Sequence, residues 1–257
     1  MEGLGQLALA AGRGGEGWTD EAAERYQRQL LLPELGLEGQ QRLSRARVAV
    51  VGAGGLGSTL LPLLVGAGVG QLRLCDGDIV SRSNLPRQTL YRTDELGGSK
   101  AQLAAERLRA LNPHCQLIAS AEYLSPENAP RLLGEVDLIL DATDNEPARR
   151  CIDAYSRAAG IPWLYASVEG WGGQLALFLP GRPGYAELFP ETPPPAPSEA
   201  PHSSAPPATA ESAHPIPVLA TTPALIASLA ATEALKYLAK KYNIEVVERE
   251  ETEEEKQ

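Results

Sequence analysis

The sequence predicts an α/β protein with a Rossmann-like, doubly wound and mainly parallel sheet. Three observations lead to this fold class. A buried apolar strand at 46–51 runs into a glycine turn at 52–58 and a helix. An acid, Asp76, ends the next strand at 71–76. Strands and helices then alternate as far as residue 179, and 257 residues suffice for one large domain.

The individual elements follow from apolar periodicity and helix caps. A helix begins at Thr19, which precedes two acidic residues, and runs through residue 30. Further helices are expected at 38–44, 59–66, 100–111, 126–133, 147–159 and 224–242. Further strands are expected at 116–120, 136–141, 162–167 and 174–179, the last two being additional C-terminal strands of the sheet.

Three segments of the chain differ in composition from the rest and lack the apolar periodicity of a folded core. Twelve of the 21 prolines lie at 180–217, which excludes a helix or a central strand there and predicts a long loop. We expect a flexible arm at 1–17 and a disordered acidic tail at 244–257. Residues 18–243 would then form a single domain that contains the loop.

Charge and cysteine content exclude several classes of function. A net charge of -10 and few aromatic residues argue against nucleic acid as a partner. The longest apolar stretch, 60–69, is broken by proline and glycine and is too short to cross a membrane. The three cysteines form no CxxC pair, and no secretory signal is recognisable. We expect a cytoplasmic protein without membrane partners.

The first chemical motif is the glycine turn, with Gly52, Gly54, Gly55 and Gly57. Glycines let the backbone approach a phosphate, and the N terminus of the following helix favours negative charge. Asp76 stands nineteen residues after the turn, where a carboxylate can accept hydrogen bonds from ribose hydroxyls. The motif predicts nucleotide binding and leaves both NAD and ATP open.

A polar run at 76–88, taken with Lys100, favours ATP. The run contains Asp78, Asn84, Arg87 and Gln88. Cations beyond the carboxyl edge of the sheet can neutralise the phosphates as charge develops on the leaving group. An NAD site has no need of them. The alternative is a solvated charged loop.

A third motif, Asp141-x-Thr143-Asp144-Asn145, ends the strand at 136–141. Mg2+ prefers one or two carboxylates plus phosphate oxygens and waters. Asp144 lies beyond the end of the strand, so we expect Asp144 rather than Asp141 to bind the ion. The alternative is that Asp144 caps the helix that begins near residue 147.

Four motifs occur in order at the spacing of one known family. They are Arg25-Tyr26-x-Arg28-Gln29, Gly52-x-Gly54-Gly55-Leu56-Gly57-Ser58, Ser83-Asn84-Leu85-x-Arg87-Gln88 and Asp141-x-Thr143-Asp144-Asn145. On these residues the chain resembles the ThiF/MoeB/HesA family, relatives of ubiquitin-activating enzymes, over about 19–179 and again at 218–236. The segment 166–174 is most similar to the ThiF branch, which serves thiamine biosynthesis.

The resemblance implies an ATP- and Mg2+-dependent adenylyltransferase. Its substrate would be the C-terminal glycine carboxylate of a ubiquitin-like sulfur carrier protein of the ThiS or MoaD type. The carboxylate attacks the α-phosphate of ATP and pyrophosphate leaves. By resemblance, Asp76 holds the ribose, and Asn84, Arg87 and Lys100 hold the phosphates. Asp144 binds Mg2+.

The same resemblance implies a homodimer and a covered substrate tail. Arg28 is similar to an arginine that reaches into the site of the other subunit; the alternative is a surface residue paired with Glu24. The proline-rich segment 180–217 resembles a crossover loop laid over the carrier's tail. That tail would end in Gly-Gly, because only glycine passes under a close backbone clamp.

The chain departs from the family pattern at the cysteines. Gly184 and Glu187 occupy the places of the first CxxC pair, and no second pair follows the last helix. The loop before Val218 also lacks cysteine. We therefore expect no zinc site and no covalent sulfur relay.

Three other functions stay open. Zinc-free relatives adenylate the C terminus of a small peptide in peptide antibiotic synthesis. A non-catalytic nucleotide-binding partner protein would keep the fold, although it has no need of four charges, Arg28, Arg87, Lys100 and Asp144, around one pocket. An NAD-dependent dehydrogenase would bind nicotinamide.

Overall fold

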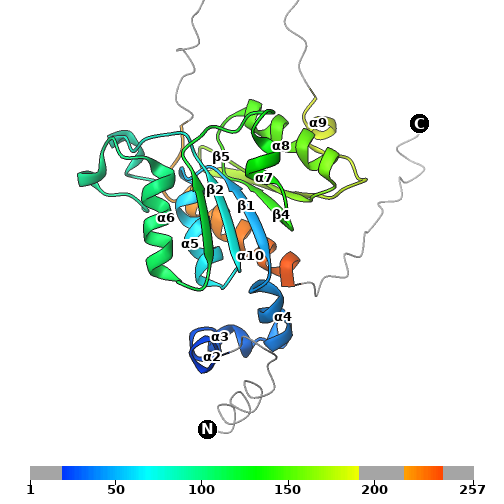
Figure 1. Cartoon of the computed structure of the whole chain (residues 1–257). Coiled ribbons are helices and arrows are strands. Elements are labelled where there is room, and N and C mark those ends of the chain that lie inside the picture. The colour runs from blue at the N-terminus through cyan, green and yellow to red at the C-terminus, as the bar shows by residue number, and fades with distance from the viewer. Residues whose placement is uncertain (1–18, 191–216, 240–257) are drawn as a thin grey trace, which may run out of the picture.

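A computed structural model gives the structure of residues 19–190 and 217–239 (Figure 1). The predicted arm at 1–17 and acidic tail at 244–257 lie outside the described residues, as does the proline-rich segment from 191 to 216. No helix in the described ranges is long and apolar enough to cross a membrane.

Six strands form one sheet in the order β3-β2-β1-β4-β5-β6. They are β1 (Arg47–Val51), β2 (Gln71–Cys75), β3 (Gln116–Ser120), β4 (Leu138–Asp141), β5 (Trp163–Glu169) and β6 (Gly172–Phe178). The first five are parallel and β6 is antiparallel to β5. This confirms the predicted mainly parallel α/β sheet. Because β1 lies between β2 and β4, the order of the strands reverses there, and such a reversal opens a crevice at the carboxyl edge.

Helices cover both faces of the sheet (Figure 1). One face packs against α5 (Gly57–Gly66), α6 (Lys100–Leu111) and α10 (Thr222–Ala239). The other packs against α7 (Ala129–Leu133), α8 (Glu146–Ala159) and α9 (Tyr185–Leu188). Within residues 19–46, three short helices precede β1, namely α2 (Asp20–Arg25), α3 (Gln27–Leu30) and α4 (Gly36–Leu43). Two 3-10 turns, η1 (Arg82–Asn84) and η2 (Thr93–Glu95), follow β2.

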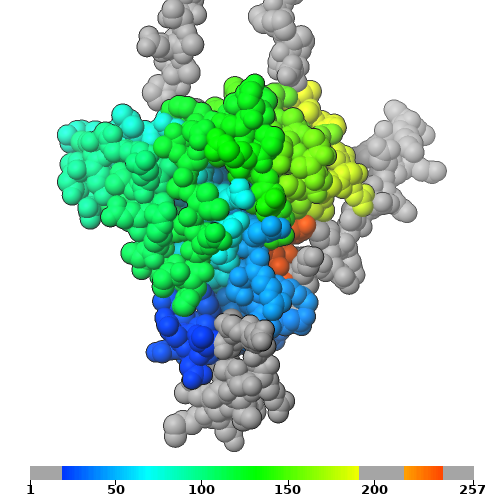
Figure 2. Space-filling view, viewed as in Figure 1, coloured from blue at the N-terminus to red at the C-terminus, as the bar shows by residue number. Residues whose placement is uncertain are grey.

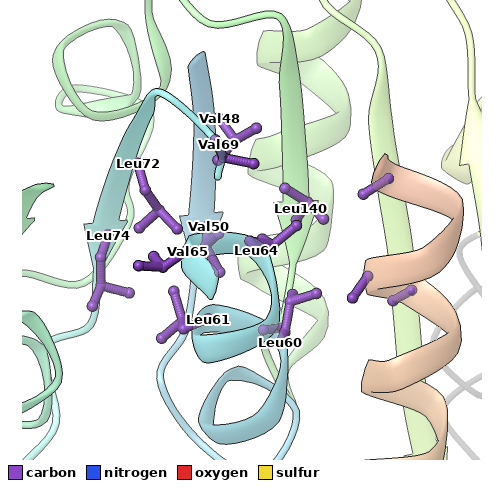
Figure 3. Packing of buried hydrophobic residues seen from close by; sticks show 14 of the residues in the cluster. Val48, Val50, Leu60, Leu61, Leu64, Val65, Val69, Leu72, Leu74 and Leu140 are labelled. Atoms are coloured by element: carbon purple, nitrogen blue, oxygen red, sulfur yellow. The ribbon is translucent and has the colours of Figure 1, made fainter. Parts of the chain in front are cut away.

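Alternating residues of β1 divide the core into two clusters. Val48 and Val50 face α5, where Figure 3 shows them with leucines of α5 and with Leu72 and Leu74 of β2. Ala49 and Val51 face α7 and α8. Strands covered on both faces are apolar at nearly every position, as the sequence of β1 is. The parallel pairing of β1 with β2 and β4 brings the carboxyl ends of these strands together at one edge.

The structure corrects two expectations for the helices. The helix expected from Thr19 to residue 30 is interrupted at Tyr26, whose buried hydroxyl accepts a hydrogen bond from Asn112 Nδ2 at 2.8 Å. The expectation of no helix within 180–217 is wrong at Tyr185–Leu188. There α9 places Tyr185 on an aromatic cluster with Trp163 and Phe178, and the flanking prolines, Pro183 and Pro190, both lie outside the helix.

Candidate active site

A cleft of about 1290 Å³ lies where the carboxyl ends of β1, β2 and β4 meet. It is large enough for a nucleotide together with a second reactant. Nine residues predicted for the site line it: Gly52, Gly54, Gly55, Asp76, Asp78, Arg87, Gln88, Lys100 and Asp144. The structure therefore brings together most of the residues that the sequence pointed to.

The glycine turn needs two of its glycines for packing. Gly52 has φ +100°, and a Cβ there would lie 2.6 Å from the carbonyl oxygen of Ala142. At Gly57, which does not line the cleft, a Cβ would lie 2.4 Å from the carbonyl oxygen of Gly52. The turn is thus wedged between β1 and the loop after β4, and it leads directly into α5.

Asp76 joins the end of β2 to the glycine turn. Its carboxylate accepts a hydrogen bond from the Ala53 N–H at 2.6 Å and another from the Asp78 N–H at 2.8 Å. Burial raises the pKa of Asp76 above its ordinary value, although those two N–H groups and Lys100 act in the opposite direction. A carboxylate held in this way retains lone pairs for further donors such as sugar hydroxyls.

Lys100, the first residue of α6, is buried and points its ammonium at Asp78. The Nζ lies 2.9 Å from Asp78 Oδ2, and the Tyr123 hydroxyl donates to the other oxygen of the same carboxylate. Burial acts to raise the pKa of Asp78, but the hydrogen bonds from Tyr123 and Lys100 outweigh it and lower that pKa. The cleft thus contains a buried cation with one partly exposed counter-ion.

Gln88 and Arg87 flank the glycine turn from the polar loop after β2. Gln88 is buried, and its Oε1 has no hydrogen-bond partner among the described residues. An unsatisfied buried acceptor is costly, so this oxygen is available to a donor from a ligand or a water molecule. Arg87 donates to the Ser83 carbonyl at 2.9 Å and lies beside Gly55.

Asp144 and Asp141 differ sharply in their surroundings. Asp144 is exposed on the cleft, and its side chain forms no hydrogen bond or ion pair within the described part of the chain. The Asp141 side chain is 0% exposed, and both of its oxygens accept hydrogen bonds, from Thr143 and Arg149. The alternative role of Asp144 as a helix cap is wrong, because the Asn145 side chain caps α8 by accepting from the Ala148 N–H.

The donor set fits a Mg–nucleotide. Helices α5, α6 and α8 all begin at the carboxyl edge of the sheet, where their N termini favour anions. An exposed, unpartnered carboxylate such as Asp144 suits a magnesium ion that takes its other ligands from phosphates and water. The described residues hold no group of three or more His, Cys, Asp or Glu side chains that could bind a metal on their own.

Besides Gly57, two residues predicted for the site do not line the cleft. Asn84 does not line the cleft; its side-chain oxygen accepts from the Ser81 N–H at 3.4 Å within η1. Arg28 is exposed on α3, which belongs to the N-terminal segment drawn in dark blue at one end of the molecule (Figure 2). The structure therefore does not bring Arg28 to the cleft of its own chain, and both assignments stay predictions.

Comparison with known proteins identifies the family. The model of the ThiF family matches residues 26–254. The chain belongs to the ThiF family.

Relatives of this ThiF-family chain agree with that result. It is 43% identical over 227 residues to the sulfur carrier protein adenylyltransferase of Thermus thermophilus, a match that covers 86% of the chain and 79% of the relative. Among solved structures it is similar to E. coli TcdA in complex with ATP, at 31% identity and a TM-score of 0.53 over 56% of this chain and 59% of that one. E. coli MccB shares the fold, with a TM-score of 0.72 at 22% identity over 85% of this chain and 63% of MccB.

The sequence analysis of this ThiF-family chain missed the cleft residues Tyr123, Arg149 and Tyr165. Tyr123 covers Gly77, whose Cβ position would lie 2.6 Å from the tyrosine ring. Arg149 stacks over the Tyr165 ring at 5.2 Å and pairs with Asp141. One signal pointed to Arg149: a buried carboxylate at a strand end requires a counter-charge nearby.

Proposed function

We propose that this protein is an ATP- and Mg2+-dependent adenylyltransferase that activates the C-terminal carboxylate of a ubiquitin-like sulfur carrier protein. One observation carries the proposal. A single cleft contains a phosphate-type glycine turn, a ribose-type acid, the cations Lys100 and Arg87, and an unpartnered carboxylate, Asp144. The name of the Thermus thermophilus relative, at 79% coverage of its length, supports the same activity.

The reaction forms an acyl-adenylate. A carboxylate oxygen of the carrier forms a bond to the α-phosphorus of ATP, the bond from that phosphorus to the bridging oxygen breaks, and pyrophosphate leaves. Positioning and neutralisation of negative charge account for most of the catalysis in phosphoryl and nucleotidyl transfer. No protein nucleophile is needed for this step.

Each cleft residue has a role in this scheme. Asp76 accepts hydrogen bonds from the ribose, and the glycine turn and the N terminus of α5 receive a phosphate. Lys100 and Arg87 neutralise the phosphates, which would compete with Asp78 for the Lys100 ammonium. Asp144 would hold Mg2+, which supplies further positive charge to the phosphates when it is bound.

The proposal extends to the partner and the assembly. The carrier is of the ThiS or MoaD type with a C-terminal Gly-Gly, and the similarity of 166–174 to the ThiF branch points to thiamine or a related sulfur cofactor. Arg28 would act in the partner site of a homodimer, since it is remote from its own cleft. The three cysteines are free thiols, which fits the reducing cytoplasm in which we place the protein.

Exchange of labelled pyrophosphate into ATP tests this function. We expect exchange with ATP, Mg2+ and an intact carrier, and none when the terminal glycine of the carrier is removed. The variant Asp144→Ala should fold and should not catalyse exchange. If ATP binds but no carrier supports exchange, the assignment is wrong.

The same assay separates the alternatives. Exchange with a short peptide but with no carrier would favour the peptide-adenylating function. Binding of ATP without exchange for any acceptor would favour a non-catalytic partner protein. A titration that follows NADH fluorescence tests the dehydrogenase function directly, and we expect no binding.

A further inference from the structure

Thr143, the residue before Asp144, forms hydrogen bonds through its N–H, its hydroxyl and its carbonyl. Its N–H and its hydroxyl both donate to Asp141 Oδ1, at 2.8 and 2.6 Å. Its carbonyl oxygen accepts a hydrogen bond from Arg149 Nη2 at 3.0 Å. The polar atoms of this one residue are therefore all bound to one acid and one arginine.

Asp141 and Arg149, the two residues that bind Thr143, are also bound to each other. Arg149 Nε donates to Asp141 Oδ2 at 3.3 Å, which closes a ring of contacts through Thr143. The pair is anchored in the sheet, because Asp141 is the last residue of β4 and the guanidinium stacks on Tyr165 of β5. The ring therefore connects two strands and α8 to the backbone of the loop after β4.

Because the Asp141–Arg149 pair is buried, a contribution to the stability of the fold explains its presence poorly. The Asp141 side chain is 0% exposed and that of Arg149 is 14% exposed. A buried ion pair costs much desolvation and is often no more stabilising than apolar residues of the same size. The pair lies beside the cleft and binds the residue that precedes Asp144, which indicates a role in positioning this loop.

We propose that Asp141 and Arg149 are positioning residues that fix the Thr143 backbone and thereby present the Asp144 carboxylate to the metal ion. This inference rests on the metal-binding role proposed for Asp144. Neither residue needs to touch the ion. Groups behind a metal ligand commonly change metal affinity or activity by about 10- to 100-fold when they are removed.

The test measures how pyrophosphate exchange depends on the Mg2+ concentration. For Arg149→Met we expect the half-maximal Mg2+ concentration to rise by about tenfold or more. The affinity for ATP measured without Mg2+ should change little. Thr143→Val keeps the backbone contacts and loses only the hydroxyl contact, so it should show a smaller shift in the same direction.

A matched control separates positioning from stability. Arg157 lies on the same helix and pairs with the buried Asp153 at 3.2 Å, outside the cleft. Arg157→Met should lower the melting temperature and leave the half-maximal Mg2+ concentration unchanged. If Arg149→Met fails to fold, Arg149→Lys serves instead, because a single ammonium cannot reproduce the two-sided guanidinium contact.

The outcomes distinguish this inference from the proposed function. If Arg149→Met or Arg149→Lys lowers only the melting temperature, as Arg157→Met does, the positioning role is wrong. Asp144→Ala is measured in parallel. If Asp144→Ala keeps the parent's response to Mg2+, the metal role of Asp144 fails and the positioning role fails with it.

Discussion

The buried ammonium of Lys100 lies 2.9 Å from Asp78, and 4% of the lysine side chain is exposed whereas half of the aspartate is. The Lys100 ammonium is thus fixed in place at the first residue of α6, and its counter-ion, Asp78, lies on the solvent side. An incoming phosphate would find a charge that has already lost most of its hydration. Charge-assisted contacts of this kind are stronger than neutral ones.

Lys100→Met should therefore reduce pyrophosphate exchange strongly. Loss of one preorganised group that stabilises transition-state charge costs about 10²- to 10³-fold in rate. Lys236→Met is the control, since Lys236 pairs with Glu233 on α10, away from the cleft. Equal exchange rates for the two variants would contradict a role for Lys100 in phosphate binding.

Gly52→Ala should destabilise the fold by about 2–4 kcal/mol, in the upper range for single substitutions. The added Cβ meets the Ala142 carbonyl, and the positive φ strains any other residue. Gly66→Ala in α5 is the matched control. A Cβ there meets nothing within 4 Å and raises helix propensity, so it should leave stability equal or higher. Urea unfolding of both variants measures the difference.

Asp141 should give stability a distinctive dependence on pH. Burial raises its pKa to about 6, although Arg149 and Thr143 act in the opposite direction. Between about pH 4, where an ordinary aspartate titrates, and pH 6, the folded chain keeps a proton that the unfolded chain has released. This group therefore makes the free energy of unfolding decrease as pH rises through that window.

The variant Asp141→Asn isolates this effect. Groups whose pKa is lowered, such as Glu95 and Glu187, stabilise above their ordinary pKa and lose this contribution as pH falls. They are common to both proteins and cancel in the difference. The stability advantage of the parent over Asp141→Asn should shrink between about pH 4 and about pH 6. A difference independent of pH would contradict the raised pKa.

Chelation should separate the catalytic metal from any structural one. We expect EDTA to abolish exchange and to leave the melting temperature of the nucleotide-free protein unchanged. Where zinc cysteines are expected from the family pattern, Glu187 accepts from the Gly184 N–H at 3.0 Å and pairs with Arg157. A fall in melting temperature on chelation would show a structural metal after all.

Mixing two inactive variants tests whether Arg28 acts across a dimer. Arg28→Ala and Asp144→Ala should each be inactive alone. If Arg28 serves the partner's site, a mixed dimer has one intact site, and random mixing in a twofold dimer should restore about a quarter of the parent activity. If the mixture stays inactive although the subunits exchange, Arg28 does not act in trans.

Much of the fold was predictable because continuous apolar runs identify strands covered on both faces. The bounds of α6 and β3 agree with the expectation. What failed depends on contacts distant in sequence. Tyr26 breaks its helix where it meets Asn112, and α9 forms because Tyr185 finds aromatic partners on β5 and β6.

The site residues likewise divide into those that the sequence predicts and those that depend on distant contacts. Residues within a few positions of strand ends, such as Asp76 and Asp144, could be predicted because parallel strands bring their carboxyl ends together. Arg149 could not be read from its helix, where it looks like an ordinary surface cation. Asn84 belongs to the polar loop by sequence, yet its side chain binds its own turn.

The hydrogen bond from Ala53 to Asp76 limits what a substitution of Asp76 can reveal about ribose binding. The carboxylate expected to hold the sugar also holds the phosphate-binding turn in place. Replacing Asp76 therefore removes the contact to the ribose and also loosens the glycine turn that contacts a phosphate. Weaker ATP binding by such a variant would overstate the ribose interaction, and an analogue lacking the ribose hydroxyls, tested on the unaltered protein, would give its true size.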